Sequence, residues 1–282
     1  MIIFKKASDL KNYLQNQRQK QVSTGFVPTM GALHEGHLSL IRNSKRENDL
    51  SVCSIFVNPT QFNDPSDFEK YPITIEEDIY ALETTSCDIL FLPDVEEVYP
   101  NGTNQVKQYN FGYLDKILEG EFRPGHFQGV CMVVERLLEL VQPTRLYLGQ
   151  KDFQQCMVIK KLAELMQCKA EIKVCPTLRE ADGLAMSSRN KRLSSEDRAK
   201  AVTIYQTLLF LKDNIDKGAL SDLKKLATKK LKQNGFRPDY VEIVDPKTLK
   251  PLNEWDSRQG AVGLIAAYLN EVRLIDNMVL CE

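Results

Sequence analysis

Short apolar runs alternate with amphipathic segments along the first 175 residues. Five runs have the length and composition of buried strands, at residues 24–27, 51–57, 88–92, 145–148 and 171–174. Apolar residues at helical spacing predict helices at 9–20, 34–47, 75–85, 111–119, 129–141 and 151–167. This alternation predicts an α/β fold with a Rossmann-like parallel sheet and right-handed crossovers. No G-x-G-x-x-G motif follows the first strand, which argues against the dinucleotide-binding variant.

The pattern changes near Pro176. Ser194 and Ser195 begin a predicted long helix to about Lys217, and a lysine-rich helix follows at 221–234. Three strands are predicted after it, at 240–244, 262–269 and 272–275, with the last two forming a tight antiparallel hairpin. Helices followed by strands indicate a second, smaller α+β domain, so we expect domains at 1–175 and 176–282.

Polar residues predict how two of the helices begin. Ser8 is a candidate cap for the helix at 9–20. Thr74 and Glu77 have the spacing of a capping box for the helix at 75–85.

The first strand leads through a turn into a helix that carries two of the three histidines. Pro28 and Gly31 interrupt the apolar run, and His34 and His37 follow at i and i+3, so both rings can project from one helix face. A helix N-terminus is a favourable site for phosphate. A zinc-protease pair needs two His at i and i+4 with a Glu between them, so this spacing argues against a metal site. The structural alternative is that both histidines only cap the helix or fill a polar pocket.

A second group of polar residues lies where the next strand ends. Asn58 and Gln61 follow the run at 51–57, at the end of the strand where open α/β sheets bind ligands. The prolines and polar residues of 59–74 predict a long irregular loop, which we interpret as a partly mobile flap over a substrate.

Composition and charge exclude some classes of partner but do not indicate a function. The 282 residues contain 37 Lys and Arg against 38 Asp and Glu, so no strong overall field attracts nucleic acid or anionic lipid. We interpret the lysines of 221–234 as a solvated helix face, because no aromatic residues are interleaved with them.

No apolar run approaches the ~20 residues that span a bilayer, and residues 1–6 lack a secretory signal, which predicts a cytoplasmic location. None of the seven cysteines forms a C-x-x-C pair, so we expect reduced core thiols rather than disulfides or a zinc site.

Four motifs in order extend this picture. They are P-T-M-G-A-L-H-E-G-H at 28–37, N-P-T-Q-F at 58–62, G-Q-K-D-F-Q-Q at 149–155 and M-S-S-R-N at 186–190. Together they resemble the signatures of the pantothenate synthetase family, ATP-dependent ligases related to class I aminoacyl-tRNA synthetases and nucleotidyltransferases. The resemblance extends from near residue 22 to Leu274-Ile275-Asp276-Asn277.

The resemblance implies a reaction and a set of site residues. Members of the family join (R)-pantoate to β-alanine through an enzyme-bound pantoyl adenylate and release AMP and pyrophosphate. The implied acid-base residue is His37. Gln61 and Gln155 would bind pantoate, and Gln61 would also lie near β-alanine. The implied ATP-binding residues are Met30, Gly31, Ala32, Leu33, His34, Glu35, Gly36, His37, Gly149, Gln150, Lys151, Asp152, Leu178, Met186, Ser187, Ser188 and Arg189. Gln150 stands where many relatives carry Glu.

The resemblance also implies partners. The small-molecule substrates would be ATP, pantoate and β-alanine, with no nucleic acid and no membrane. Mg²⁺ is expected to arrive with ATP, because no carboxylate cluster indicates a metal site of the protein's own. The family is commonly dimeric, so a homodimer is expected, and the C-terminal domain is expected to close over the site.

The residue types suit this chemistry. Charge grows on the departing pyrophosphate, so fixed cations and N–H donors directed at it lower the barrier. Lys151 offers a mobile point charge, and Arg189 offers a planar fork suited to phosphate. Ser187 and Ser188 add hydroxyl donors, and His34 and His37 add ring N–H donors. With these roles, the six residues form the predicted catalytic set.

Other functions share several of these features. A nucleotidyltransferase would transfer AMP or CMP to a phosphorylated acceptor and stop there. A tRNA-charging enzyme is a further alternative, since H-x-G-H and M-S-S-R resemble variants of that group's signatures, although no anticodon-binding extension is evident. A non-catalytic nucleotide sensor would keep the phosphate site yet need neither Gln61 nor Gln155.

Overall fold

The computed structural model describes residues 1–62, 68–69, 71–103 and 107–281. The chain forms two compact units. The first comprises Met1–Gly149 and Gln154–Pro176, and the second comprises Gln150–Phe153 and Thr177–Glu282. In the described part of the chain, no helix has the length and apolar character that crossing a bilayer requires.

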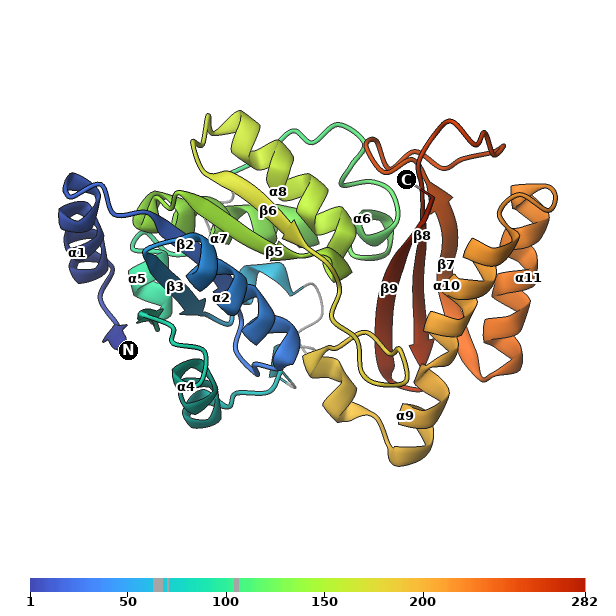
Figure 1. The fold of residues 1–282 in the computed structure, drawn as a ribbon, viewed down its shortest axis with the longest axis horizontal. Helices are drawn as coiled ribbons and strands as arrows, with labels where there is room; N and C mark the ends of the chain where they lie inside the picture. Colours follow the sequence, from blue (N-terminus) through green and yellow to red (C-terminus); the bar gives the residue numbers. More distant parts are fainter. Residues whose placement is uncertain (63–67, 70, 104–106, 282) are drawn as a thin grey trace. The chain divides into compact units, whose positions relative to one another are not determined.

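The first unit contains a six-stranded parallel sheet (Figure 1). Its strands are β1 (Ile2–Phe4), β2 (Thr24–Thr29), β3 (Leu50–Ile55), β4 (Ile89–Phe91), β5 (Arg145–Gly149) and β6 (Glu171–Cys175), in the spatial order β1-β4-β3-β2-β5-β6. The parallel sheet and its five predicted strands are confirmed. The additional strand β1 is a three-residue edge strand, too short to stand out as an apolar run.

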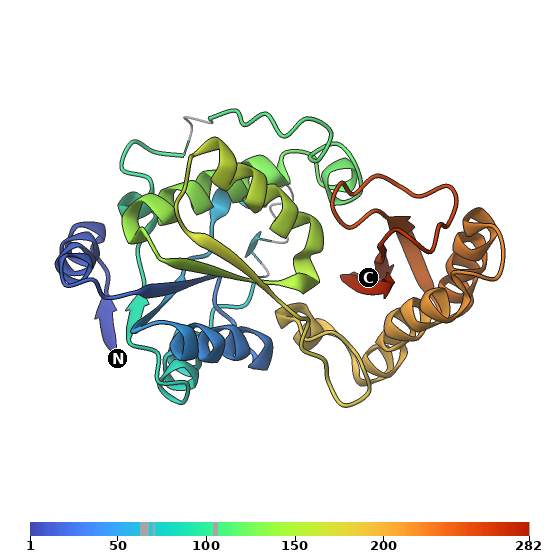
Figure 2. The same ribbon diagram turned by 45° about the horizontal axis from the view of Figure 1, so that its top comes forward.

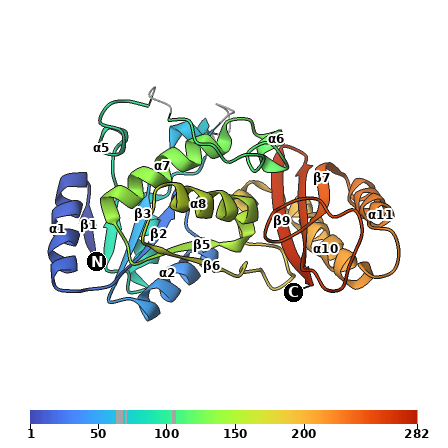
Figure 3. The same ribbon diagram turned by 90° about the horizontal axis from the view of Figure 1, so that it is seen from above.

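Helices cover both faces of this sheet. They are α1 (Ala7–Gln19), α2 (Glu35–Glu47), α4 (Ile75–Glu83), α5 (Val95–Val98), α6 (Glu119–Phe122), α7 (His126–Val141) and α8 (Phe153–Leu165), with 3₁₀ turns η1 (Pro59–Gln61) and, in the second unit, η2 (Gln150–Asp152). Phe26 belongs to the apolar cluster that contains residues of α1, α7 and α8, whereas its neighbour Val27 belongs to the cluster that contains residues of α2 and α4. Figures 2 and 3 show α7 and α8 on one side of the sheet and α2 on the other.

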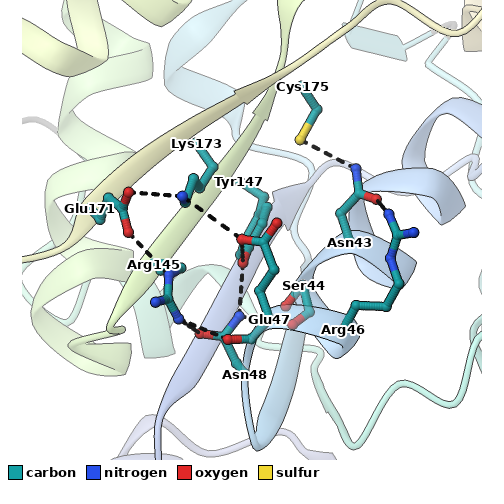
Figure 4. Close-up of polar contacts among 10 residues, drawn as sticks. All are labelled: Asn43, Ser44, Arg46, Glu47, Asn48, Arg145, Tyr147, Glu171, Lys173 and Cys175. Carbon is teal, nitrogen blue, oxygen red and sulfur yellow. Dashed lines mark hydrogen bonds and ion pairs between the residues drawn. The ribbon is translucent and has the colours of Figure 1, made fainter.

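The end of α2 is fixed to the sheet far from its histidines. The Tyr147 hydroxyl on β5 donates to Glu47 Oε2 at 2.9 Å and accepts from Asn48 Nδ2 at 2.8 Å. Figure 4 shows these contacts beside the Arg145, Glu171 and Lys173 ion pairs. A Cβ on Gly25 of β2 would lie only 2.2 Å from Ser44 Oγ, so glycine is needed for α2 to approach this closely. These contacts set the position of α2 on the sheet.

The second unit has a three-stranded antiparallel sheet with helices packed against it (Figure 1). Its elements are η3 (Ser188–Arg192), α9 (Ser195–Ala201), α10 (Thr203–Asn214), α11 (Leu220–Gln233), β7 (Phe236–Val244), β8 (Ala261–Leu269) and β9 (Val272–Cys281). The predicted α+β composition and the β8–β9 hairpin are confirmed. The expected single helix at 194–217 is wrong, because α9 and α10 are separated at Val202.

Three local predictions in the first unit are wrong. Ser8 does not begin α1; Ala7 is already helical, and its N–H donates to Glu97 Oε2 at 2.8 Å. The capping box at Thr74 is not formed, because the Thr74 hydroxyl bonds Asp78 instead of the helix backbone. Residues 112–118 form turns rather than a helix, and the carbonyls of Leu114 and Ile117 accept hydrogen bonds from Gln154.

The expected flap at 59–74 is only partly within the described residues. Its start is ordered as η1, and residues 63–67 and 70 lie outside the part described, so the flap stays a prediction. All seven cysteines lie in the described part of the chain and none is in a disulfide; five of them are buried, as expected for core residues.

Candidate functional site

The predicted ligand-binding stretches of the first unit follow neighbouring parallel strands. β2 lies between β3 and β5, so the chain leaves β2 towards one side of the sheet and later returns on the other. Such a switch point, at the carboxyl ends of the strands, is where open α/β sheets bind ligands. Met30–His37 follow β2, and Asn58 and Gln61 follow β3. Gly149 is the last residue of β5, on the other side of β2.

The loop between β2 and α2 is held by a buried carboxylate. Asp78 of α4 is 2% exposed, and its two oxygens accept the N–H groups of Ala32 and Leu33 at 2.9 and 2.7 Å. Gly31 and Ala32 both have positive φ, at +81° and +50°, which a non-glycine residue seldom adopts. The two hydrogen bonds stabilise this strained turn. Asp78 was not predicted, because an acidic residue in the first turn of a helix is common for reasons of the helix dipole alone.

His34 and His37 lie together at the start of α2, with ring centroids 4.1 Å apart. His34 is the N-cap residue, and its Nδ1 accepts the N–H of Gly36 at 3.1 Å. This acceptor role puts the proton of a neutral His34 on Nε2. The expectation that both rings project from one face is confirmed, and the capping role proposed as the alternative also holds for His34. Glu35 next to it is exposed, and Arg42 lowers the pKa of its carboxyl.

Gln61 contacts the β2 loop from the end of β3. Its Nε2 lies 2.8 Å from Met30 Sδ, and its Oε1 accepts from Asn58 Nδ2 at 3.3 Å. Asn58 is fully buried and accepts from the Tyr99 hydroxyl at 2.9 Å. Burial raises the pKa of Tyr99 to about 12, so its phenol stays a donor near neutral pH. The structure therefore brings together the predicted residues Met30 and Gln61.

Two adjacent glutamines on α8 have different roles. Gln154 is 4% exposed and uses both ends of its amide: Oε1 accepts from Glu119 N, and Nε2 donates to the carbonyls of Leu114 and Ile117. Gln155 is half-buried, and within the described residues its side chain makes no hydrogen bond. The amide of Gln155 is thus available to a ligand, whereas the amide of Gln154 is fully used in hydrogen bonds to the protein backbone.

In the second unit, Asn277 of β9 holds the backbone of the Q-K-D stretch. It is 2% exposed, and its Nδ2 donates to the carbonyls of Gln150 and Lys151 at 2.9 and 2.8 Å. The Gln150 amide donates back to Asn277 Oδ1 at 3.3 Å. Lys151 Nζ lies 3.9 Å from Asp152, and only 18% of the Lys151 side chain is exposed. These contacts fix the backbone from which Lys151 projects.

The predicted residues Leu178 and Met186 lie opposite each other in the same unit. Met186 N donates to the Leu178 carbonyl at 3.0 Å, beside the isolated bridge between Arg179 and Ala185. Arg179 then binds Asp276 of β9 with two hydrogen bonds, at 2.6 and 3.1 Å. Burial raises the pKa of Asp276, and the Arg179 pair opposes that rise. Arg179 thereby ties the 178–186 segment to the strand that also holds Lys151.

The M-S-S-R stretch forms the start of η3. Ser187 is its N-cap, and its hydroxyl oxygen accepts the N–H of Arg189 at 3.3 Å. Ser188 is buried, and Arg189 is half-buried. Asn190 donates from Nδ2 to the Ala185 carbonyl at 3.0 Å, which closes the loop. Ser187, Ser188, Arg189, Met186 and Leu178 thus form one compact segment.

Sequence reasoning missed the residues that support the site. Asp78 and Arg179 bind backbone or side chains far away in the sequence, and no local pattern identifies such partners. His126 lies in a stretch, 122–127, that matches the family, but its partner Gln61 could not be predicted. Asp276 and Asn277 had one signal, their place in the matched stretch at 274–277, but no role could be read from it.

Known proteins similar to this chain identify a family. The model of the family "Pantoate-beta-alanine ligase" matches residues 2–279. Pantothenate synthetase from Cytophaga hutchinsonii is 46% identical over 99% of both chains, and that from Bacteroides thetaiotaomicron is 45% identical over 96% of this chain and 95% of the relative.

Solved structures similar to this chain belong to the same family. A pantothenate synthetase from Thermus thermophilus has a TM-score of 0.92 and 42% identity, with full coverage of both chains. A pantoate-beta-alanine ligase from Francisella tularensis, described as complexed with beta-gamma ATP and beta-alanine, has a TM-score of 0.84 and 39% identity, and covers 99% of this chain and 98% of its own.

Proposed function

Because the chain belongs to the pantoate-beta-alanine ligase family, it ligates pantoate and β-alanine with ATP, and we propose that the reaction passes through a pantoyl adenylate. In the first step a carboxylate oxygen of pantoate attacks the α-phosphorus as the bond to pyrophosphate breaks. In the second step the β-alanine amine attacks the acyl carbon, loses a proton and displaces AMP. The family match over residues 2–279 is the observation that carries this proposal.

Residues of the first unit would bind the nucleotide and pantoate. Met30–His37 lie at the N-terminus of α2, where the helix dipole favours phosphate. His34 with its proton on Nε2 would donate to a phosphate oxygen, and His37 would serve as the acid-base residue. Gln61 and Gln155 would hold the pantoate hydroxyls. Neutral amides suit this task, since they orient pantoate without forming an ion pair with the carboxylate that must attack.

Residues of the second unit would stabilise the charge of the phosphates. Lys151 and Arg189 would neutralise negative charge that builds up as pyrophosphate leaves, and Ser187 and Ser188 would add hydroxyl donors. The bonds from Asn277 to the backbone at 150 and 151 support this role, because they fix the stretch that carries Lys151. Leu178 is apolar yet 38% exposed, so it offers a surface to the adenosine.

Mg²⁺ would enter with ATP and reduce the charge of the triphosphate. The fit to this chain rests on Asp152, which follows Lys151 and keeps 48% of its side chain exposed. Its carboxylate oxygen is the type of ligand that Mg²⁺ prefers. Further ligands would be phosphate oxygens and water.

The proposal is tested by supplying ATP, pantoate and β-alanine to folded protein and measuring AMP and pantothenate in equal amounts. Exchange of labelled pyrophosphate into ATP that depends on pantoate would support the adenylate. Exchange that requires a phosphorylated acceptor instead would favour a nucleotidyltransferase. Absence of both AMP release and pyrophosphate exchange from well-folded protein would refute catalysis.

We further propose a homodimer in the cytoplasm. The dimer is inferred because the family is commonly dimeric. The location is inferred because none of the seven described cysteines is in a disulfide, which suits a reducing compartment. Light scattering coupled to size-exclusion chromatography should give twice the 32.2 kDa chain mass.

A further inference from the structure

His126, the first residue of α7, is buried and uses both ring nitrogens within the protein. It is 6% exposed, with Nδ1 2.8 Å from the Gln61 carbonyl oxygen and Nε2 3.0 Å from Arg123 Nη1. A carbonyl oxygen only accepts hydrogen bonds, and a guanidinium only donates them. The proton must therefore be on Nδ1 and the lone pair on Nε2, so Arg123 selects one neutral tautomer of His126.

The same turn of α7 touches η1 at a second point. A Cβ on Gly129 would lie 2.0 Å from the Thr60 carbonyl oxygen, so only glycine permits this approach of the two backbones. The Gly129 carbonyl accepts from Asn58 Nδ2 at 3.1 Å. His126 and Gly129 are three residues apart and share one helix face. Two hydrogen bonds on that face hold the turn on which Gln61 lies.

We propose that His126 is a positioning residue for pantoate. Its Nδ1–H holds the Gln61 carbonyl and so orients the Gln61 backbone, from which the side-chain amide extends towards the substrate. Both ring nitrogens are already bonded to protein, so His126 acts through Gln61. The inference rests on the proposed function, in which Gln61 binds pantoate.

Arg123 sets the tautomer and is itself held from the preceding helix. Its Nη1 lies 3.9 Å from Glu119 Oε2, and the Glu119 N–H donates to Gln154 Oε1 at 3.0 Å. The connection therefore extends from α8 through α6 to α7 and η1. This assigns a role to the F-R-P-G-H-F turn at 122–127 that its sequence alone does not explain.

Two substitutions separate the roles of the ring nitrogens. In His126→Asn the amide N–H₂ can take the place of Nδ1 and donate to the Gln61 carbonyl. In His126→Gln the amide reaches the place of Nε2, which leaves that carbonyl without its donor. We expect His126→Gln to raise the pantoate KM about tenfold, as loss of one hydrogen bond of about 1.4 kcal/mol would do. The ATP KM and kcat should change less than about twofold, and His126→Asn should restore most of the pantoate affinity.

The outcomes are distinguishable. If both variants raise the pantoate KM equally, or if the ATP KM rises in parallel, His126 supports the fold in general and the inference is wrong. If Gln61→Ala leaves the pantoate KM unchanged, Gln61 is not the substrate residue and the inference falls with that assignment. If the unmodified enzyme releases no AMP, the proposed function itself fails, whatever the variants do.

A measurement on the unmodified protein covers the case in which the variants do not fold. Nitrogen NMR of histidine-labelled protein distinguishes a protonated ring nitrogen from one that bears a lone pair. The inference requires a protonated Nδ1 and an unprotonated Nε2 for His126 at the assay pH. The opposite tautomer, or a ring protonated on both nitrogens, would overturn it.

Discussion

At the scale of single residues, hydrogen-bond capacity separates side chains that serve the fold from those available to a ligand. Gln154 and Gln155 are adjacent and chemically identical, yet the first uses its whole amide inside the protein. Removing a buried amide lowers the free energy of unfolding more than removing an exposed one, because the buried groups that it bonded are left without a partner and without water. The two residues should therefore respond differently to the same substitution.

We predict that Gln155→Ala weakens pantoate binding at least tenfold while ATP binding changes little. Gln154→Ala should instead lower the free energy of unfolding by about 1–3 kcal/mol, because three backbone groups lose their partner. Calorimetric titration with each ligand and urea unfolding measure the two effects. Equal losses of pantoate and ATP affinity in Gln155→Ala would contradict its assignment to pantoate.

Asp78 gives a second residue-scale prediction. Asp78→Asn keeps the shape but replaces one acceptor oxygen with an N–H₂ donor, which opposes either Ala32 N–H or Leu33 N–H. We expect the free energy of unfolding to fall by about 1–3 kcal/mol and ATP to bind more weakly, because the loop loses a restraint. Asp88→Asn, which removes a half-buried partner of Lys45, is a control that should leave ATP binding unchanged.

At the scale of elements, β9 holds two segments of the second unit that carry predicted site residues. Asn277 and Asp276 are consecutive residues of this strand and hold separate segments, Asn277 the backbone at 150–151 and Asp276 the guanidinium of Arg179. A strand within a sheet is stiffer than the loops that bond to it, so it holds both segments in fixed positions.

We predict that Asn277→Ala impairs ATP binding without contacting ATP. The carbonyls of Gln150 and Lys151 would lose their donor, and Lys151 would be less well placed. The KM for ATP should rise about tenfold, and the pantoate KM should change less. Asn270→Ala in the exposed β8–β9 turn is the matched control, expected to leave both constants unchanged. Similar behaviour of the two variants would argue against a role for Asn277 in holding Lys151.

At the scale of the whole molecule, the predicted site residues are divided between two compact units. His37 and Gln61 belong to the first unit, and Lys151 and Arg189 belong to the second. Each unit has its own apolar core, so substitutions at the half-buried His37 or Lys151 should spare the fold.

We predict that His37→Ala and Lys151→Ala each reduce pantoate-dependent pyrophosphate exchange by at least a hundredfold. Their thermal unfolding midpoints should stay within a few degrees of the unmodified protein. Lys161→Ala, which removes an exposed ion pair of α8, is a control that should keep full exchange. Full exchange in both site variants would show that the assignment of these residues is wrong.

The amino-acid sequence by itself determined the parallel sheet, the second α+β unit and the stretches that resemble a ligase. A continuous apolar run indicates a strand that is covered on both faces, and Phe26 and Val27, which are consecutive, belong to different apolar clusters as such a strand requires. Only the tertiary structure decided which polar groups meet. Asp78 with Ala32, His126 with Gln61 and Asn277 with Lys151 are separated by 46, 65 and 126 positions, and no local signal encodes such partners. Their hydrogen bonds form only after the apolar faces have packed, and that packing determines which amides and imidazoles stay available to a substrate.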